Sequence, residues 1–191
     1  MRHSHCVLTA SEKNELLRGA RQALTAALTP GAQAPLLNST NFSATLQLKR
    51  GAFVTLHNQH HELRGCIGTF ETHDSLFETV ARMAVAAGLH DPRFPKVTPG
   101  EMENLKFEIS VLSESLPCHP EDIIVGQHGM MIKKGFSRGV LLPQVATEWN
   151  MDRKQFLAAV CQKAGLAPDA WQREDVELRC FTAEVFSDDD I

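Results

Sequence analysis

The stretch Leu63-Arg64-Gly65-Cys66-Ile67-Gly68-Thr69-Phe70 (LRGCIGTF) combines strand-forming residues with two closely spaced glycines and a cysteine. Its composition predicts a strand that runs into a glycine-bent loop. Upstream, TLQL (45–48) and AFVTL (52–56) flank a Lys49-Arg50-Gly51 turn, which predicts a hairpin. We therefore expect LRGCIGTF to be the third strand of a sheet.

Helices are predicted where capping-box spacing is followed by apolar residues every three or four positions. Thr9 with Glu12 begins one helix, which extends to Leu28. Ser75 begins a second helix, which we expect Gly88 to end in a left-handed cap. The same signals predict a short helix over 143–149 and a longer one over 152–165.

Further strands follow from alternating or short apolar runs between turn residues. Alternation predicts half-buried strands over 105–111 and 181–185. Short strands are predicted over 122–125, 130–134 and 139–142. Hairpins precede and follow helices without regular strand-helix alternation, so the expected fold class is α+β, with an antiparallel β-sheet flanked by helices.

Length and composition indicate a soluble protein. The chain has 191 residues, 43% hydrophobic and 22% charged, which fits a single domain over 1–191. Its apolar runs are too short to cross a bilayer and its first ten residues lack the apolar segment of a signal peptide, so we expect a cytoplasmic protein without membrane contact. Five scattered cysteines without a CxxC predict free thiols. The net charge of -4 disfavours nucleic acid as a partner.

Cys66 is the first candidate catalytic residue. Arg64, two positions away, could lower the pKa of the thiol and favour the nucleophilic thiolate. The flanking glycines let backbone N–H groups approach a ligand, and those of Ile67 to Thr69 could hold an anionic group. The alternative is a small buried cysteine at a strand end with a purely structural role.

Three further segments could supply charge or move protons. Asp91 and Arg93 lie in a proline-stiffened loop, which suits either substrate positioning or an internal ion pair that ties the loop to the body. Glu108 would be a general base if buried near Cys66, and an ordinary sheet residue if exposed. His128, in the turn GQHG (126–129), could act as acid, base or ligand, or lie in solvent.

A metal site is the weaker interpretation of the histidines, which are His57, His60, His61 and His73. The HxxHH spacing matches no metal signature, and adjacent histidines point to opposite faces of an extended chain. Met1-Arg2-His3 could hold Cu(II) or Ni(II) through its amine, amides and imidazole. We favour solvent-exposed histidines and a frayed terminus, and we assign no metal ligands.

The order of the motifs resembles the AMMECR1 domain family. The matching blocks are LRGCIGTF at 63–70, DPRFPKVT at 91–98, EISVLS at 108–113, GQHGM at 126–130, GVLLPQVA at 139–146 and FLAAVCQKAGLAPDAW at 156–171. The resemblance extends nearly end to end, and LRGCIG is its most specific part. It implies a larger portion built on an antiparallel sheet, packed against a smaller subdomain, with a cleft between them lined by LRGCIG. The site positions that it implies are Arg64, Gly65, Cys66, Gly68, Asp91, Arg93, His128, Pro143 and Gln144.

Two functions are compatible with this resemblance, which attaches no reaction, substrate or cofactor to the chain. In bacteria and archaea, such proteins resemble the A component of a three-part system with a Memo-like protein and a radical SAM protein. The chain would then be a cleft-based thiol enzyme or substrate-handling component, with Cys66 activated by Arg64 and protons moved by Glu108 or His128. The alternative is a non-catalytic binding or scaffold protein, whose LRGCIG segment docks a ligand or partner.

Overall fold

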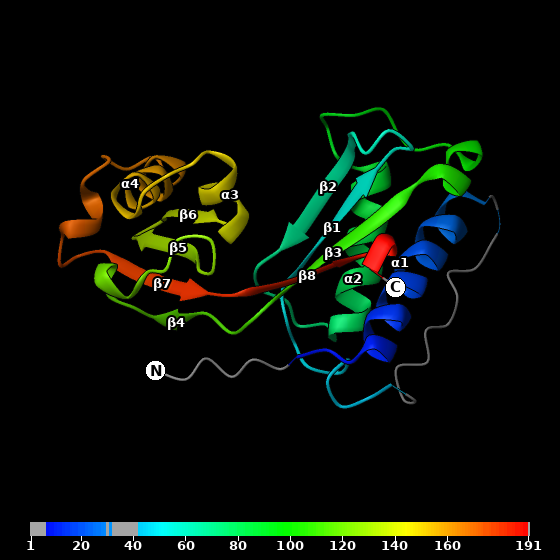
Figure 1. Cartoon of the computed structure of the whole chain (residues 1–191), viewed down its shortest axis with the longest axis horizontal. Coiled ribbons are helices and arrows are strands. Elements are labelled where there is room, and N and C mark those ends of the chain that lie inside the picture. The colour runs from blue at the N-terminus through cyan, green and yellow to red at the C-terminus, as the bar shows by residue number, and fades with distance from the viewer. Residues whose placement is uncertain (1–6, 30, 32–41, 191) are drawn as a thin grey trace. The chain divides into compact units, whose positions relative to one another are not determined.

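The computed structural model describes residues 7–29, 31 and 42–190, and these form an α+β protein (Figure 1). The chain divides into two compact units. The first unit contains 1–112 together with 184–191, and the second contains 113–183. The chain therefore leaves the first unit after one of its strands and returns to it near the C-terminus.

The first unit is built on a four-stranded sheet with the order β2-β1-β3-β8. The central strand β1 pairs antiparallel with both β2 and β3. The strands are β1 (Ala52–His57), β2 (Leu63–Thr69), β3 (Lys106–Leu112) and β8 (Ala183–Ser187). LRGCIGTF is thus a strand, as the sequence predicts, and it lies at the edge of the sheet.

Helices α1 (Ala10–Leu28) and α2 (Leu76–Leu89) pack against each other and against one face of this sheet (Figure 1). The predicted capping boxes are both confirmed, at Thr9 with Glu12 and at Ser75 with Glu78. Buried residues of β1 alternate with half-buried ones, so one side of the strand joins the core with the two helices. The other side carries Phe53, Thr55 and His57.

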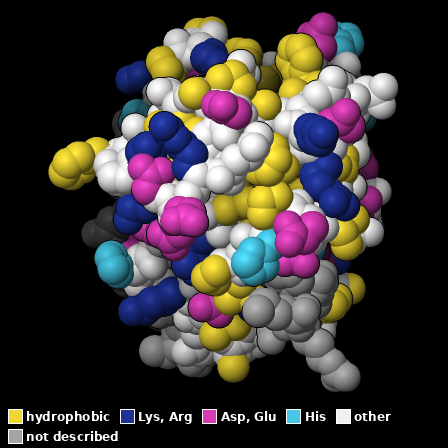
Figure 2. Space-filling model, turned by 90° about the vertical axis from the view of Figure 1, so that its left-hand side faces the viewer, with side chains coloured by type: hydrophobic (Ala, Val, Ile, Leu, Met, Phe, Trp, Pro, Cys, Tyr) yellow, Lys and Arg dark blue, Asp and Glu magenta, His cyan; other side chains and the backbone are white. Residues whose placement is uncertain are grey.

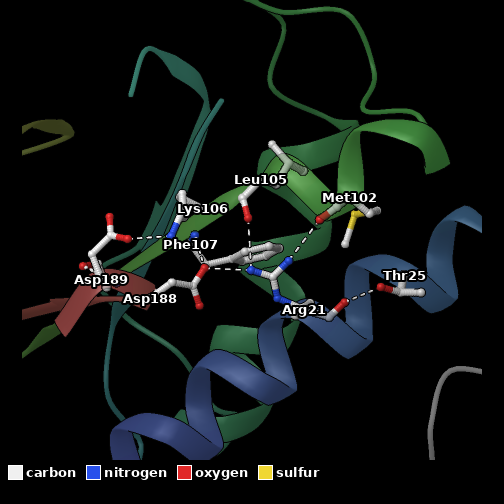
Figure 3. Close-up of polar contacts among 9 residues, drawn as sticks. Arg21, Thr25, Met102, Leu105, Lys106, Phe107, Asp188 and Asp189 are labelled. Atoms are coloured by element: carbon white, nitrogen blue, oxygen red, sulfur yellow. Dashed lines mark hydrogen bonds and ion pairs between the residues drawn. The ribbon is translucent and has the colours of Figure 1, made fainter. Parts of the chain in front are cut away.

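The C-terminus is attached to α1 and β3 by a polar cluster around Arg21 (Figure 3). Its guanidinium donates to the carbonyl oxygens of Met102 and Leu105, each at 3.0 Å, and lies over the ring of Phe107. It also contacts Asp188 Oδ2 at 2.7 Å. Asp188 belongs to the 3-10 helix η5 (Asp188–Asp190), so this contact fixes the chain after β8.

The second unit has its own four-stranded sheet, with the order β4-β7-β5-β6, and its own core. The strands are β4 (Leu116–Pro117), β5 (Gly129–Lys134), β6 (Ser137–Leu141) and β7 (Glu177–Phe181). The helices are α3 (Pro143–Glu148) and α4 (Arg153–Lys163), with 3-10 turns η3 (Pro120–Asp122) and η4 (Ala170–Gln172). In the first unit, η2 (Pro99–Asn104) precedes β3. The described helices are all too short or too polar to cross a bilayer.

Two predicted strands are wrong, because tertiary contacts use their backbone differently. Residues 45–48 form a turn, in which Leu46 is buried and the carbonyls of Leu46 and Leu48 accept the N–H groups of Phe77 and Leu76 at the start of α2. Residues 122–125 also form no strand, and the carbonyl of Ile124 instead accepts two N–H groups from the following turn. The backbone carbonyls of each segment therefore accept hydrogen bonds from the N–H groups of a neighbouring element, and they do not pair with another strand.

Two predicted element ends also differ from the structure. Gly88 lies inside α2, which continues to Leu89 and is capped by His90 in a conformation with negative φ. The predicted strand over 181–185 spans the end of β7 and the beginning of β8, which are interrupted at Thr182. The helix predicted over 152–165, by contrast, ends close to its predicted end, since it ends at Lys163 and Gly165 follows with a φ of 73°.

Candidate functional site

The two glycines of the LRGCIG motif permit close packing and do not bend the strand. Neither has a positive φ, and both lie within β2. A Cβ on Gly65 would lie 2.2 Å from the carbonyl oxygen of Ala87 in α2, so only glycine lets the helix approach the sheet here. A Cβ on Gly68 would lie 2.1 Å from the ring of Phe53, which covers this position from β1. The predicted glycine-bent loop is therefore wrong.

Asp91 and Arg93 hold the outer edge of β2 at Cys66. Asp91 Oδ2 accepts the backbone N–H of Cys66 at 2.9 Å, and the guanidinium of Arg93 donates to the carbonyl oxygen of Cys66 at 3.2 Å. The two side chains are themselves joined by an ion pair of 2.7 Å. Together they take the place of a neighbouring strand at this residue. This arrangement matches the internal ion pair that we considered for the loop.

The electrostatics of this clamp favour the ionised carboxylate. The hydrogen bond from Arg93 holds the pKa of Asp91 well below its usual range, against the opposing effect of burial. Asp91 is 5% exposed, so its charge is compensated almost entirely by protein groups. A buried carboxylate with this many donors is a structural anchor.

Arg64 does not activate Cys66. Its guanidinium donates to Glu101 Oε1 at 2.8 Å and to the carbonyl oxygen of Pro95 at 2.7 Å. Arg64 therefore ties β2 to the 91–98 loop and η2. The expected lowering of the Cys66 pKa by Arg64 is wrong, because burial, the largest influence, raises the pKa of that thiol.

The sulfur of Cys66 lies on the sheet face that is turned away from α1 and α2. The register pairs Cys66 with Thr55 and Thr55 with Glu108, so one cross-strand row carries all three side chains. Thr55 Oγ1 donates to the sulfur at 3.2 Å, which partly offsets the effect of burial on the thiol pKa. The positive charge of Arg93 also lowers this pKa, and the negative charges of Asp91 and Glu108 raise it. Cys66 is half-buried among polar groups, and burial favours its neutral thiol over the thiolate.

The remaining motif residues do not form the expected anion cradle. Cys66 directs its N–H and carbonyl outward to Asp91 and Arg93, and these directions alternate along an antiparallel strand. The N–H groups of Ile67 and Thr69 therefore point toward β1 and that of Gly68 points outward, so the three do not converge on one anion. The Ile67 side chain packs against the core, and the Thr69 hydroxyl donates to the carbonyl of Glu71.

His128 and Gln144 belong to the second unit, whereas Cys66 belongs to the first. His128 is buried, and its Nδ1 accepts the N–H of Ile124 at 3.2 Å, so the solvent-exposed alternative is wrong. Gln144 follows Pro143 in the first turn of α3, and its Oε1 is buried without a hydrogen-bond partner among the described residues. Neither residue contributes to the Cys66 row within the first unit.

Two partners were not foreseen from the sequence, namely Thr55 beside the sulfur and Glu101 beside Arg64. Alternation in AFVTL places Thr55 on the polar side of β1, and this signal would become informative once the strand register was known. Thr98 with Glu101 has capping-box spacing, and Glu101 does accept the N–H of Thr98 at 2.7 Å. The same carboxylate therefore caps η2 and holds Arg64.

A small cavity adjoins this ion pair. It has a volume of about 190 Å³ and is lined by Glu101 and by polar residues that include Asn58, Gln59 and His60. Typical ligand pockets measure about 300–1,000 Å³. The cavity is therefore too small for more than a few waters or a very small polar molecule.

Neither metal binding nor nucleic-acid binding gains support from the described residues. Over 7–29, 31 and 42–190, no three His, Cys, Asp or Glu side chains are grouped to hold a metal ion. Met1-Arg2-His3 lies outside that range. On the face shown in Figure 2, Lys and Arg side chains are interspersed with Asp and Glu. Lys134, which with Lys133 and Arg138 makes a small basic patch in the sequence, pairs with Asp175 at 2.8 Å.

The sequence of this chain matches one protein family. The chain matches the AMMECR1 family model over residues 17–186, and it belongs to this family. A protein of Methanosarcina mazei is 35% identical over 189 residues, covering 95% of this chain and 94% of that protein. A Thermococcus kodakarensis protein is 44% identical over 152 residues, covering 74% of each chain.

The fold is also shared with a solved structure. An uncharacterized protein from Pyrococcus horikoshii, determined by crystallography, superposes with a TM-score of 0.78 and 40% sequence identity. The match covers 90% of this chain and 89% of that protein. These relatives support the family and the fold, and none of their names specifies a reaction.

Proposed function

We propose that this protein is a binding component, which presents the outward face of its first sheet to a partner, and that Cys66 is not an activated nucleophile. The observation that carries this proposal is the clamp on the backbone of Cys66, in which Asp91 accepts its N–H and Arg93 donates to its carbonyl. A backbone that is fixed before binding loses little conformational entropy in a complex. The backbone of the LRGCIG motif is therefore already rigid before a partner binds.

The state of the thiol supports the same proposal. A nucleophilic cysteine needs a lowered pKa or an adjacent base. Burial raises the pKa of Cys66, and Arg64, the cation nearest in sequence, is engaged by Glu101. The outward face presents the Cys66 thiol, the Thr55 hydroxyl and the Glu108 carboxylate. These groups suit recognition of a partner through hydrogen bonds and one negative charge.

The family resemblance supplies the partners to test first, which are a Memo-like protein and a radical SAM protein. Affinity for each purified partner should be measured for the wild type, Cys66→Ser and Glu108→Lys. We expect Cys66→Ser to bind with unchanged affinity and Glu108→Lys to bind at least about tenfold more weakly, because like-charge contacts cost several kcal/mol. The matched control is Glu103→Lys, at an exposed position in η2. Equal binding by Glu108→Lys and Glu103→Lys would contradict the proposed face.

A thiol enzyme is the second candidate, favoured by the Thr55 hydrogen bond to the Cys66 sulfur and by the nearby Glu108 carboxylate. Iodoacetamide labelling of the Cys66 peptide across a pH series separates the two functions. The binding proposal expects an apparent pKa above the roughly 8.5 of a free cysteine. An apparent pKa below that value, with loss of turnover in a folded Cys66→Ser variant, would favour the enzyme.

A further inference from the structure

Cys118 and Cys180 form a pair of adjacent thiols in the second unit. The register of β4 and β7 pairs Leu116 with Cys180, and the N–H of Cys118 donates to the carbonyl of Leu178 at 3.2 Å. Cys118 and Cys180 therefore lie diagonally opposite each other on two adjacent antiparallel segments of the same chain. Burial raises the pKa of both thiols, and each thiol also shifts the pKa of the other, so the two side chains lie close together. Both are free thiols in this structure.

Cys118 and Cys180 lie near the two ends of the second unit, where a covalent link would join them. The second unit begins at Ser113 and ends at Ala183, so the two cysteines lie close to the points where the chain enters and leaves it. The strand that carries Leu116 is only two residues long, so few ladder hydrogen bonds hold this end. A covalent link here would close a loop that contains β5, β6, α3 and α4.

The two sulfurs differ in access, which sets the order of reaction. Cys118 is half-buried, whereas Cys180 is 2% exposed. An external oxidant therefore reaches Cys118 first, and Cys180 is placed to react only with Cys118. Burial raises the pKa of both thiols, so each is protonated at neutral pH and exchange is slow.

We propose that Cys118 and Cys180 are a redox-responsive dithiol. A small-molecule disulfide converts it to an internal disulfide, which links the two ends of the second unit. In the first step, the Cys118 thiolate attacks the small disulfide, forming a mixed disulfide and releasing one small thiol. In the second step, the Cys180 thiolate attacks the Cys118 sulfur, and the second small thiol leaves. The two protein thiols lose two protons and two electrons, and the small disulfide gains them as two thiols.

The test uses the full chain under native conditions with oxidised glutathione at mildly alkaline pH. Remaining thiols are blocked, and the protein is digested without reduction for mass spectrometry. We expect a peptide pair joined through Cys118 and Cys180 as the main oxidised product. We also expect the oxidised protein to unfold at a higher temperature than the reduced protein, because the link constrains the unfolded chain.

Three variants distinguish a resolving partner from a merely neighbouring thiol. In Cys180→Ser, Cys118 should stop at the mixed disulfide with glutathione, and the amount of glutathione on Cys118 should rise roughly tenfold or more over the wild type, because no second thiol at high effective concentration is left to displace it. In Cys118→Ser, Cys180 should stay unmodified. Cys161→Ser is the matched control, since Cys161 is buried in α4 of the same unit, and it should form the same link as the wild type.

The wild-type result alone can overturn the proposal, so it does not depend on any variant folding. The proposal is wrong if glutathione remains on Cys118 without an internal disulfide, or if both thiols stay reduced while other cysteines react. A link from Cys118 to a cysteine other than Cys180 would also overturn it.

Discussion

Asp91 Oδ2 accepts the backbone N–H of Cys66 at 2.9 Å across a separation of 25 residues. This contact joins the most specific segment of the sequence to a loop that follows α2. Because Arg93 completes the clamp at the carbonyl of the same residue, the edge of the first sheet is closed at Cys66. A closed edge does not pair with a strand of another chain at this residue, which is why our proposal assigns binding to the outward face of the sheet.

Asp91→Asn should destabilise the protein by roughly 1–3 kcal/mol, because it removes a charged acceptor that satisfies buried donors. Urea unfolding monitored by circular dichroism measures the change. Asp74→Asn is the matched control, since Asp74 forms an exposed ion pair with Arg82, and such pairs contribute about 0–1 kcal/mol. Equal losses in the two variants would contradict the anchoring role of Asp91.

The stabilisation by Asp91 should disappear in acid. Its pKa in the folded protein is lowered by the hydrogen bond from Arg93, so the unfolded chain binds a proton at higher pH than the folded protein does. The contribution is complete above about pH 4, the unfolded pKa of aspartate, and is lost as the pH falls below it. Unfolding midpoints across an acidic pH series should therefore converge for the wild type and Asp91→Asn.

The three glycines Gly65, Gly68 and Gly100 should respond to alanine in a fixed order. Gly65→Ala should cost about 1–3 kcal/mol or more, because the new Cβ meets the backbone of Ala87. Gly68→Ala should cost less, since it displaces only the Phe53 ring, which can rotate. Gly100→Ala has open space and should stay within about 0.5 kcal/mol. Thermal unfolding of the three variants tests this order, and a larger loss at Gly68 than at Gly65 would contradict it.

Glu12→Gln should remove an acid-dependent part of the stability of the first unit. Hydrogen bonds from Ser43 and Thr9 lower the pKa of Glu12 to about 2, and the residue is 8% exposed. The folded pKa lies below the unfolded one, so the contribution is full above about pH 4.5 and is lost toward pH 2. We expect a loss of roughly 1–2 kcal/mol at neutral pH, as for other helix caps.

The control for Glu12 is Glu78→Gln, which changes the exposed capping box of α2. Urea unfolding at neutral and acidic pH should show the smaller effect for Glu78→Gln. If the two variants lose the same stability at every pH, the burial of Glu12 has no special role.

Arg21 and Asp188 should be energetically coupled, because the guanidinium and the carboxylate meet at 2.7 Å at the centre of the cluster in Figure 3. A double-mutant cycle with Arg21→Ala and Asp188→Ala should give a coupling of about 0.5–3 kcal/mol. The Glu15–Arg18 pair of α1, at 4.0 Å and largely exposed at Arg18, should give a coupling near zero. A cycle without coupling at Arg21 would contradict the attachment of the C-terminus through this cluster.

Local signals explain why much of the fold was predictable. Capping boxes at Thr9 and Ser75 fixed the starts of two helices, because they depend only on residues three positions apart. Alternation predicted β3 for the same reason. Residues 45–48 and 122–125 misled the prediction, since their carbonyls accept N–H groups from α2 and from a turn, and no local pattern reveals such acceptors.

The sequence predicted several residues of the candidate site, and it did not predict what those residues do. The sequence singled out Cys66, Arg64, Asp91 and Glu108. In the structure Asp91 binds the backbone N–H of Cys66, and Glu108 lies in the same cross-strand row as Cys66. Arg64, however, bonds to Glu101, a partner 37 residues away, and its proximity to Cys66 in sequence therefore had no consequence for the thiol. His128 and Gln144 lie in the other unit.

The amino-acid sequence by itself determined the family, the α+β class, the helix starts and the strand that carries the motif, because these depend on short-range spacing and on the motif residues. Only the tertiary structure decided that Gly65 and Gly68 serve packing, that Asp91 and Arg93 clamp a backbone, and that burial raises the pKa of the Cys66 thiol. Burial and hydrogen-bond partners set the chemistry of a side chain, and both come from residues distant in the chain.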